Sequence, residues 1–194
     1  MISGDWGRPL IPGETIERCA DDAALASASG TGTILAAQSG DVFRSLGGPN
    51  PSRAVGAVPL DLIECRVDGR THLAAAHVVV RRPGRLGWLR GPLTLVMVSG
   101  HLGRYEPAPR AHPGDGILDV VEVAETMTLR QRLMARRRSR TGSHLPHPEI
   151  STTRARDLRR SFDEPLLVVV DGRAIATTRH LDIAVLPAAY EHAV

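Results

Sequence analysis

From Ala54 onward, the apolar residues fall in short runs that are rich in Val, Ile and Leu and separated by Gly and Pro. Runs of this kind are typical of β-strands. We expect strands in VPLDLIECRV, THLAAAHVVVRR, LTLVMVSG, ILDVVEV, LLVVVDG and LDIAVLP. Asp68-Gly69 joins the first two runs and is a two-residue hairpin signal. Many short strands with this punctuation predict a mainly β fold, namely a β-sandwich.

The first 52 residues follow a different pattern. The stretch IERCADDAALAS (16–27) has apolar residues at helical spacing and predicts a helix with one weakly apolar face. A short strand is expected in TILAA (33–37), then a turn in QSGD and a helical turn in DVFRSLG. We therefore expect two parts. Residues 1–52 form a truncated α/β segment, and residues 53–194 form the sandwich, with the last residues packing back on the first part.

One helix is expected among the strands, in MTLRQRLMARRRSR (127–140). Leu129, Leu133 and Met134 share one side of it and are predicted to dock on the sandwich. Arg136, Arg137 and Arg138 are then left to face outward, where they either attract an anionic membrane or form a solvated surface. The helix contains no aromatic side chain that could stack on bases, which argues against a nucleic-acid groove.

The amino-acid composition limits the classes of protein to which this chain can belong. All 24 basic residues are Arg, the formal charge is +3 and the pI is about 9.5. That charge predicts mild attraction to anionic surfaces and is no nucleic-acid signature by itself. Cys19 and Cys65 fit no metal-binding spacing and suit a reducing compartment. The sequence has neither an export signal nor an apolar run of membrane-spanning length, so a soluble cytoplasmic protein is expected.

An ordered set of short motifs carries a family resemblance. MVSGHLGRYEPAPRAHPGDGILDVVEV (97–123) contains A-P-R-A followed by D-G-I-L-D-V. TGSHLPHPEI, LLVVVDGR and LDIAVLPAAY follow it, and ILAAQSGDVFRSLG precedes it. Over roughly residues 31–190 the chain resembles the accessory β-domain and part of the nucleotide site of diacylglycerol kinase-type lipid kinases, whose fold is related to that of NAD kinases.

The resemblance implies ATP-dependent phosphorylation of a lipid hydroxyl such as that of diacylglycerol. Its G-T-G-N-D segment corresponds to residues 37–41, so the implied nucleotide-binding residues are Ser39, Gly40, Asp41 and Arg44. Gly4 and Asp5 correspond to its phosphate-cradling G-G-D-G-T loop, with Trp6 in place of a glycine. The alternative for these first residues is an irregular tail.

The loop that ends at Asp115-Gly116 has two interpretations. Similar loops in the family hold a structural Mg²⁺, and by position its ligands here are the Asp115 carboxylate and the carbonyls of His112 and Ile117. Mg²⁺ prefers oxygen ligands and readily keeps several waters beside one carboxylate. In the other interpretation, Asp115 only accepts backbone N–H groups in a turn that precedes a strand.

The family's catalytic carboxylate is missing from its expected position. The D-G-E triplet is replaced here by Asp171-Gly172-Arg173, and Arg cannot accept a proton. A general base is worth about 10²–10⁴ in rate. We interpret Asp171 as the first residue of a hairpin turn, and we identify no catalytic residue.

The sequence thus favours a catalytically degenerate protein that binds anionic phospholipid, diacylglycerol-type lipid or a partner protein. Such a protein would lie in the cytoplasm or at the inner membrane surface. An active kinase completed by a partner or a second copy is the alternative, and a basic nucleic-acid-binding module is a weaker one.

Overall fold

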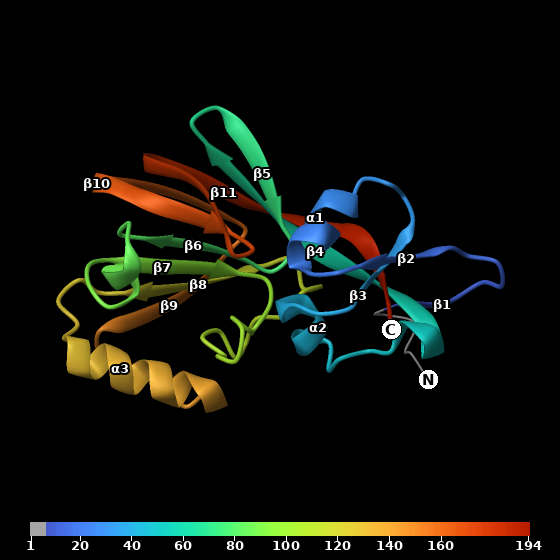
Figure 1. Ribbon diagram of the computed structural model, residues 1–194, viewed down its shortest axis with the longest axis horizontal. Helices are drawn as coiled ribbons and strands as arrows, with labels where there is room; N and C mark the ends of the chain where they lie inside the picture. Colours follow the sequence, from blue (N-terminus) through green and yellow to red (C-terminus); the bar gives the residue numbers. More distant parts are fainter. Residues whose placement is uncertain (1–6) are drawn as a thin grey trace.

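The computed structural model describes residues 7–194, which form two lobes joined by two long strands (Figure 1). The smaller lobe contains the first elements of the chain: β1 (Arg8–Pro9), β2 (Ile16–Cys19), α1 (Asp22–Ala28), β3 (Ile34–Ala37), α2 (Asp41–Ser45) and the 3-10 turn η1 (Pro51–Arg53). The remaining elements are β4 (Gly56–Val67), β5 (Arg70–Ala74), β6 (His77–Arg81), η2 (Arg85–Trp88), β7 (Leu93–Met97), β8 (Leu118–Val123), α3 (Leu129–Arg138), η3 (Ser139–Thr141), β9 (Ile150–Ala155), β10 (Asp157–Val170) and β11 (Arg173–Ala193).

The strands of residues 7–194 belong to one continuous hydrogen-bonded sheet. Its main path runs β1-β4-β11-β10-β6-β7-β8-β9, and every pair along it is antiparallel. β5 pairs with β4, whereas β2 and β3 form a short parallel pair beside the end of β11. β4 pairs along nearly its whole length with residues 182–193 of β11, and both strands run from one lobe into the other in Figure 1. They are the structural link between the lobes.

The large lobe has a sandwich core because the sheet bends over on itself. Ile63 of β4 and Ile183 of β11 belong to the same buried cluster as Val80 of β6, Val96 of β7 and Val120 of β8. β4 and β8 stand far apart in the strand order, so only a folded sheet brings their side chains together. This confirms the predicted mainly β, sandwich-like fold.

The smaller lobe is packed on the ends of the long strands. Leu25 of α1, Leu35 of β3 and Val42 of α2 are fully buried against a cluster that includes Leu60 of β4 and Tyr190 of β11. The end of β11 also pairs in parallel with β3 through His192 and Leu35. The last residues of the chain are therefore part of the hydrophobic core of this lobe.

Two Asp-Gly turns set the register of the long hairpins. Asp68 and Gly69 have φ angles of 50° and 76°, and they connect β4 to β5. Asp171 and Gly172 have φ angles of 42° and 79°, and they connect β10 to β11. Two consecutive residues in the left-handed region form the turn whose twist matches a β-hairpin, and Asp-Gly is a favoured sequence for it. Both hairpin predictions are confirmed.

Other predicted elements need correction. The helix predicted over residues 16–27 is wrong in its first part, because residues 16–19 pair with β3 as strand β2. The helix begins at Asp22, where the side chain of Asp21 accepts the Ala24 N–H at 2.9 Å. The predicted strand 71–82 is divided into β5 and β6, which pair with different neighbours. β9 was not predicted, because its sequence ISTTRA is mostly polar and exposed.

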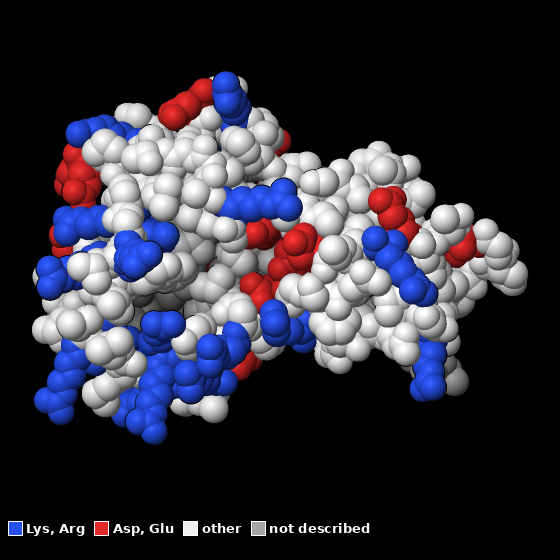
Figure 2. Space-filling model, viewed as in Figure 1, with Lys and Arg blue, Asp and Glu red and all other residues white. Residues whose placement is uncertain are grey.

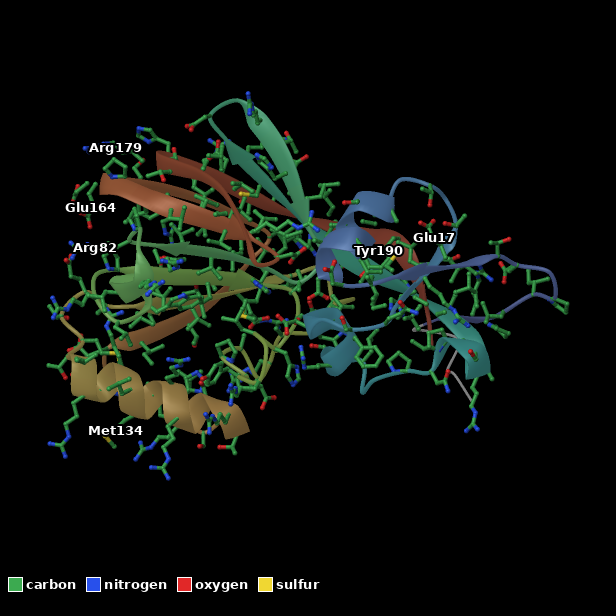
Figure 3. The ribbon with its side chains drawn as sticks, in the orientation of Figure 1. Glu17, Arg82, Met134, Glu164, Arg179 and Tyr190 are labelled. Carbon is green, nitrogen blue, oxygen red and sulfur yellow. The ribbon has the colours of Figure 1, made fainter. Side chains whose placement is uncertain are left out.

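The orientation predicted for α3 is also wrong. Leu129, Leu133 and Met134 are 46%, 47% and 46% exposed, and Met134 projects from the outer side of the helix (Figure 3). Arg132, which is 5% exposed, faces the sheet instead. It donates to the backbone carbonyls of Gly91, Ala124 and Met127, so hydrogen bonds to loop carbonyls fix the rotation of the helix. None of the helices in residues 7–194 combines the length and apolar character needed to cross a bilayer.

Candidate functional site

Four ionisable side chains meet where the two lobes join. Asp22 begins α1, Asp41 begins α2, His77 begins β6, and Asp171 lies in the turn between β10 and β11. Asp22, Asp41 and His77 are at most 7% exposed. Their charges interact strongly enough to change one another's pKa. We call these four residues the junction cluster.

Asp22 caps the short helix α2. Its carboxylate accepts the N–H of Asp41 at 2.6 Å and the N–H of Val42 at 3.0 Å. Burial raises the pKa of Asp22 to about 6, although these two hydrogen bonds favour the charged form. The contact requires glycine at position 40, where φ is 110° and a Cβ atom would lie 2.4 Å from the Asp22 Oδ1 atom.

Asp41 connects the small lobe to the sandwich. Its Oδ1 atom accepts the Gly103 N–H at 2.8 Å and Arg44 Nη1 at 3.0 Å, while Oδ2 lies 3.3 Å from His77 Nδ1. Burial opposes ionisation of Asp41, but His77, the Gly103 N–H and Arg44 together outweigh it, so the pKa of Asp41 is lowered. Burial likewise disfavours charged His77, yet Asp41 and the charges of Asp171 and Asp22 raise the pKa of His77 overall.

Asp171 anchors the segment that leads into β6. Its carboxylate accepts the N–H groups of Ala75, Ala76 and His77 at 2.7, 3.1 and 3.0 Å. Burial is the main reason that the pKa of Asp171 is raised. The neighbouring Arg173 is exposed and lies outside the cluster. Asp171 thus forms the predicted hairpin turn and also contributes a partly buried carboxyl group to the junction.

Tyr190 of β11 is buried beside the cluster, between α1 and β4 in Figure 3. Its hydroxyl has no hydrogen-bond partner among residues 7–194. Burial, followed by the charges of Asp22 and Asp171, raises the pKa of Tyr190 well above its usual value. Sequence reasoning missed Asp22, His77 and Tyr190. The Asp21-Asp22 pair ahead of an Ala-rich helix was the one local signal that pointed toward any of them.

The predicted nucleotide-binding residues 39–44 do come together, around the start of α2. Ser39 Oγ donates to the Ala20 carbonyl at 2.7 Å, and Arg44 binds both the Gly40 carbonyl and Asp41. The N–H groups that would hold a phosphate here already bind the Asp22 carboxylate. As arranged, these residues do not fit an ATP phosphate. Gly4 and Asp5 lie outside the described residues.

The predicted magnesium loop is held by protein contacts. Asp115 Oδ1 accepts the Ile117 N–H at 3.1 Å, and Oδ2 forms an ion pair with Arg154. The His112 carbonyl accepts the Asp115 N–H at 3.4 Å. Within residues 7–194, no three His, Cys, Asp or Glu side chains form a metal-binding group. A Mg²⁺ ion at Asp115 would have to displace Arg154, so the loop as arranged does not offer a free carboxylate.

A cavity of about 370 Å³ lies between α3 and the outer face of the sheet. Its apolar walls come from β7, β8 and the segments around α3: Leu89, Leu93, Leu95, Leu102, Val121, Val123, Met127, Ala135 and Ile150. The cavity also borders Gly103, whose N–H binds Asp41. Figure 2 shows a hollow above α3 that is bordered by basic side chains. One end of the cavity therefore reaches the junction cluster through a single residue.

His144, in the loop after η3, also lines this cavity. Its Nε2 atom lies 3.1 Å from the Pro107 carbonyl, and therefore donates to it. Burial lowers the pKa of His144, so the neutral ring is favoured. The histidine is held by this contact with the protein backbone.

Comparison with known proteins agrees with the fold. Residues 63–192 match the family model of the YegS C-terminal NAD kinase beta sandwich-like domain. No curated protein sequence matches the chain. Two similar solved structures are proteins from Bacillus anthracis strain Sterne assigned as diacylglycerol kinases, each with a TM-score of 0.64 and 91% of this chain covered. They are 16% and 13% identical, and the match covers 76% and 77% of their chains.

A third similar structure is described as one of the diacylglycerol kinases of the same strain. It has a TM-score of 0.54 and is 17% identical to this chain. It is matched over 82% of this chain and 66% of its own. At these identities the structures establish similarity of fold alone. The family model matches well over half of the chain, so the chain belongs to the family of YegS C-terminal NAD kinase beta sandwich-like domains.

Proposed function

We propose that this member of the YegS-like, lipid kinase-like family binds an acyl lipid in the cavity beneath α3 and does not by itself transfer phosphate from ATP. The cavity carries this proposal. It has a volume of about 370 Å³, and most of the residues that wall it are apolar, leucine being the commonest. Pockets of this size and composition are typical of sites for small apolar ligands.

The position of the cavity supports a lipid rather than an unrelated apolar ligand. Gly103 borders the cavity and donates its N–H to Asp41 of the junction cluster. In the lipid kinases that the sequence resembles, Asp41 corresponds to a nucleotide-site residue. A lipid bound beneath α3 therefore has one end beside the place where the family resemblance puts the phosphate donor.

Two observations support the loss of phosphate transfer. The N–H groups of Asp41 and Val42 bind the Asp22 carboxylate, which carries the same sign of charge as a phosphate. Arg173 replaces the carboxylate that the resemblance implies as the proton acceptor, and its guanidinium stays protonated. The residues at these positions therefore neither bind the phosphates of ATP nor deprotonate a lipid hydroxyl.

The proposal also places the chain at the surface of an anionic membrane. Leu129, Leu133 and Met134 are exposed on the outer side of α3, next to the exposed Arg130 and Arg137. Apolar side chains can enter the interface while arginines bind lipid phosphates, which is the usual pattern of interfacial helices. The basic side chains around α3 form the densest positive region in Figure 2.

An active lipid kinase completed by a partner or a second copy is the second candidate. The junction cluster favours it, because Asp41, His77 and Asp171 keep buried, interacting ionisable groups where the two lobes join. Such groups are common at sites of acid–base chemistry. Their hydrogen bonds to backbone N–H groups equally suit a purely structural role.

The test combines lipid binding with turnover. Purified protein is incubated with diacylglycerol-containing vesicles and Mg²⁺·ATP, and both bound lipid and phosphorylated lipid are measured. Ala135→Trp fills the cavity and should abolish lipid uptake, whereas Leu133→Trp on the exposed side of the same helix should preserve it. Phosphorylated lipid would favour the second candidate. Equal lipid uptake by Ala135→Trp and wild type would exclude the cavity as the binding site.

A further inference from the structure

The side chains that line the cavity beneath α3 carry a net positive charge. Three arginines line it, namely Arg85, Arg132 and Arg136, and no aspartate or glutamate does so among the described residues. Arg136 is held at the edge by Tyr105, whose hydroxyl accepts its Nε–H at 2.9 Å. Positive charge beside an apolar wall is costly unless an opposite charge compensates it.

Arg132 is the most buried of the three. Its Nε atom donates to the Met127 carbonyl at 3.1 Å, and Nη2 donates to the Ala124 carbonyl at 2.8 Å and to the Gly91 carbonyl. All of these acceptors are neutral. Within residues 7–194, no carboxylate forms an ion pair with Arg132, and its Nη1 atom has no hydrogen-bond partner. Arg132 lines the cavity, and its guanidinium therefore keeps a positive charge there that no carboxylate pairs with among the described residues.

We propose that the cavity selects an anionic lipid, a single acyl chain that ends in a carboxylate or a phosphate monoester, over a neutral acylglycerol. This inference rests on the proposed function, because it assumes that the cavity takes a lipid. The apolar walls bind the chain, and the positive charge of the Arg132 guanidinium in the cavity wall attracts the head group. Arg85 and Arg136 add to the positive potential around the head group. A neutral head group leaves all three charges uncompensated.

The experiment compares matched ligands of one chain length. Dodecanoate, dodecyl phosphate, dodecanol and monododecanoylglycerol are titrated as monomers into the full chain, and binding is followed by calorimetry. Dodecanoate, dodecyl phosphate or both should bind at least about 10-fold more tightly than either neutral ligand. The tighter of the two anions identifies the head group. Inorganic phosphate alone should bind weakly, because it lacks the chain.

Two variants test the residue assignment. Arg132→Gln should reduce the preference for anions to about 3-fold or less. Arg70→Gln removes an exposed arginine of β5 that does not line the cavity, and it should leave the preference intact. If Arg132→Gln does not melt cooperatively, Arg136→Gln replaces it and should weaken anion binding without abolishing it. The comparison of ligands on the wild type needs no variant at all.

The outcomes separate this inference from the proposed function. If the neutral ligands bind as tightly as the anions, the selection of an anionic head group is wrong while lipid binding stands. Binding of none of the four ligands contradicts the proposed function and the inference together. An unchanged preference in a folded Arg132→Gln variant would remove Arg132 from the site.

Discussion

Nδ1 of His77 lies 3.3 Å from Oδ2 of Asp41, and this contact joins the first residue of β6 to the first residue of α2. Both side chains are buried, and each favours the charged form of the other. The pKa of His77 is raised, so the stability gained from charging it is fully present below about pH 6.5. That stability is lost as the pH rises through the raised pKa of His77.

The raised pKa of Asp22 predicts a second pH dependence of the protein's stability. The pKa of this carboxyl group is raised from 3.8 to about 6, so the folded protein binds a proton that the unfolded chain releases. The free energy of unfolding should therefore fall as the pH rises from about 4 to about 6, by on the order of 3 kcal/mol at most. Asp22→Asn should remove this dependence. Asp157→Asn, at an exposed position, should keep it. Chemical denaturation at several pH values measures the difference, and identical pH profiles for all three proteins would contradict the assignment.

Asp171 should matter for stability far more than its hairpin position suggests. Asp171→Ala leaves the N–H groups of Ala75, Ala76 and His77 without their acceptor. Buried donors that lose their partner are costly, so we expect a loss on the order of 3–5 kcal/mol in the free energy of unfolding. Arg173→Ala in the same hairpin is exposed and should change it by less than about 0.5 kcal/mol. Urea unfolding of both variants decides the point, and similar small effects would mean that the three hydrogen bonds contribute little.

Local signals in the sequence were enough to predict the strands and hairpins of the sandwich. Asp68-Gly69 and Asp171-Gly172 place two residues with positive φ where the chain must reverse, and neighbouring residues alone determine such turns. The strand β2 and the orientation of the correctly predicted helix α3 were missed because distant contacts determine them. β2 is a strand because it pairs with β3, and α3 is rotated by the bonds of Arg132 to the carbonyls of Gly91 and Ala124.

The candidate site was only partly predictable for a similar reason. The family resemblance identified Asp41 and Asp171, which lie in recognisable motifs. Asp22, His77 and Tyr190 lie in other elements, and tertiary pairing brings them together: β6 pairs with β10 beside Asp171, and β3 pairs with the end of β11. A lone His in an apolar run carries no local signal that it will lie beside three carboxyl groups.

ATP binding should be weak in this chain. The Asp22 carboxylate occupies the N–H groups of Asp41 and Val42, and it would repel a phosphate that approached them. We expect Mg²⁺·ATP to bind no more tightly than about 1 mM. Asp22→Asn removes the negative charge and should tighten binding, whereas Asp157→Asn should not. Micromolar binding to the wild type in calorimetry would contradict this prediction and favour the active-kinase alternative.

If the loop at Asp115 binds Mg²⁺, the effect of the ion on the melting temperature should differ between the wild type and two variants of the loop. If the Asp115 carboxylate binds the ion, Mg²⁺ should raise the melting temperature of the wild type, because binding to the folded state stabilises it. Arg154→Gln frees the carboxylate from its ion pair and should increase that response. Asp115→Asn should abolish it. Thermal melts with and without Mg²⁺ compare the three proteins, and equal responses would assign the loop to turn formation alone.

The outer side of α3 should bind anionic membranes through both apolar and basic residues. Leu129, Leu133 and Met134 are exposed there, whereas the inward side is fixed by Arg132. Sedimentation with vesicles should therefore rise with phosphatidylglycerol or cardiolipin content and weaken as salt shortens the screening length, about 8 Å at physiological ionic strength.

Two triple variants separate the contributions to membrane binding. Replacing Arg136, Arg137 and Arg138 by Gln should reduce the dependence on anionic lipid and on salt. Replacing Leu129, Leu133 and Met134 by Ser should weaken binding at every salt concentration, because the apolar contact is not screened. All six residues are exposed, so both variants should fold, and circular dichroism is the control. A protein whose helix is only a solvated surface would sediment equally well in all three forms. A nucleic-acid binder would instead lose affinity for DNA or RNA in the arginine variant and show no preference for lipid.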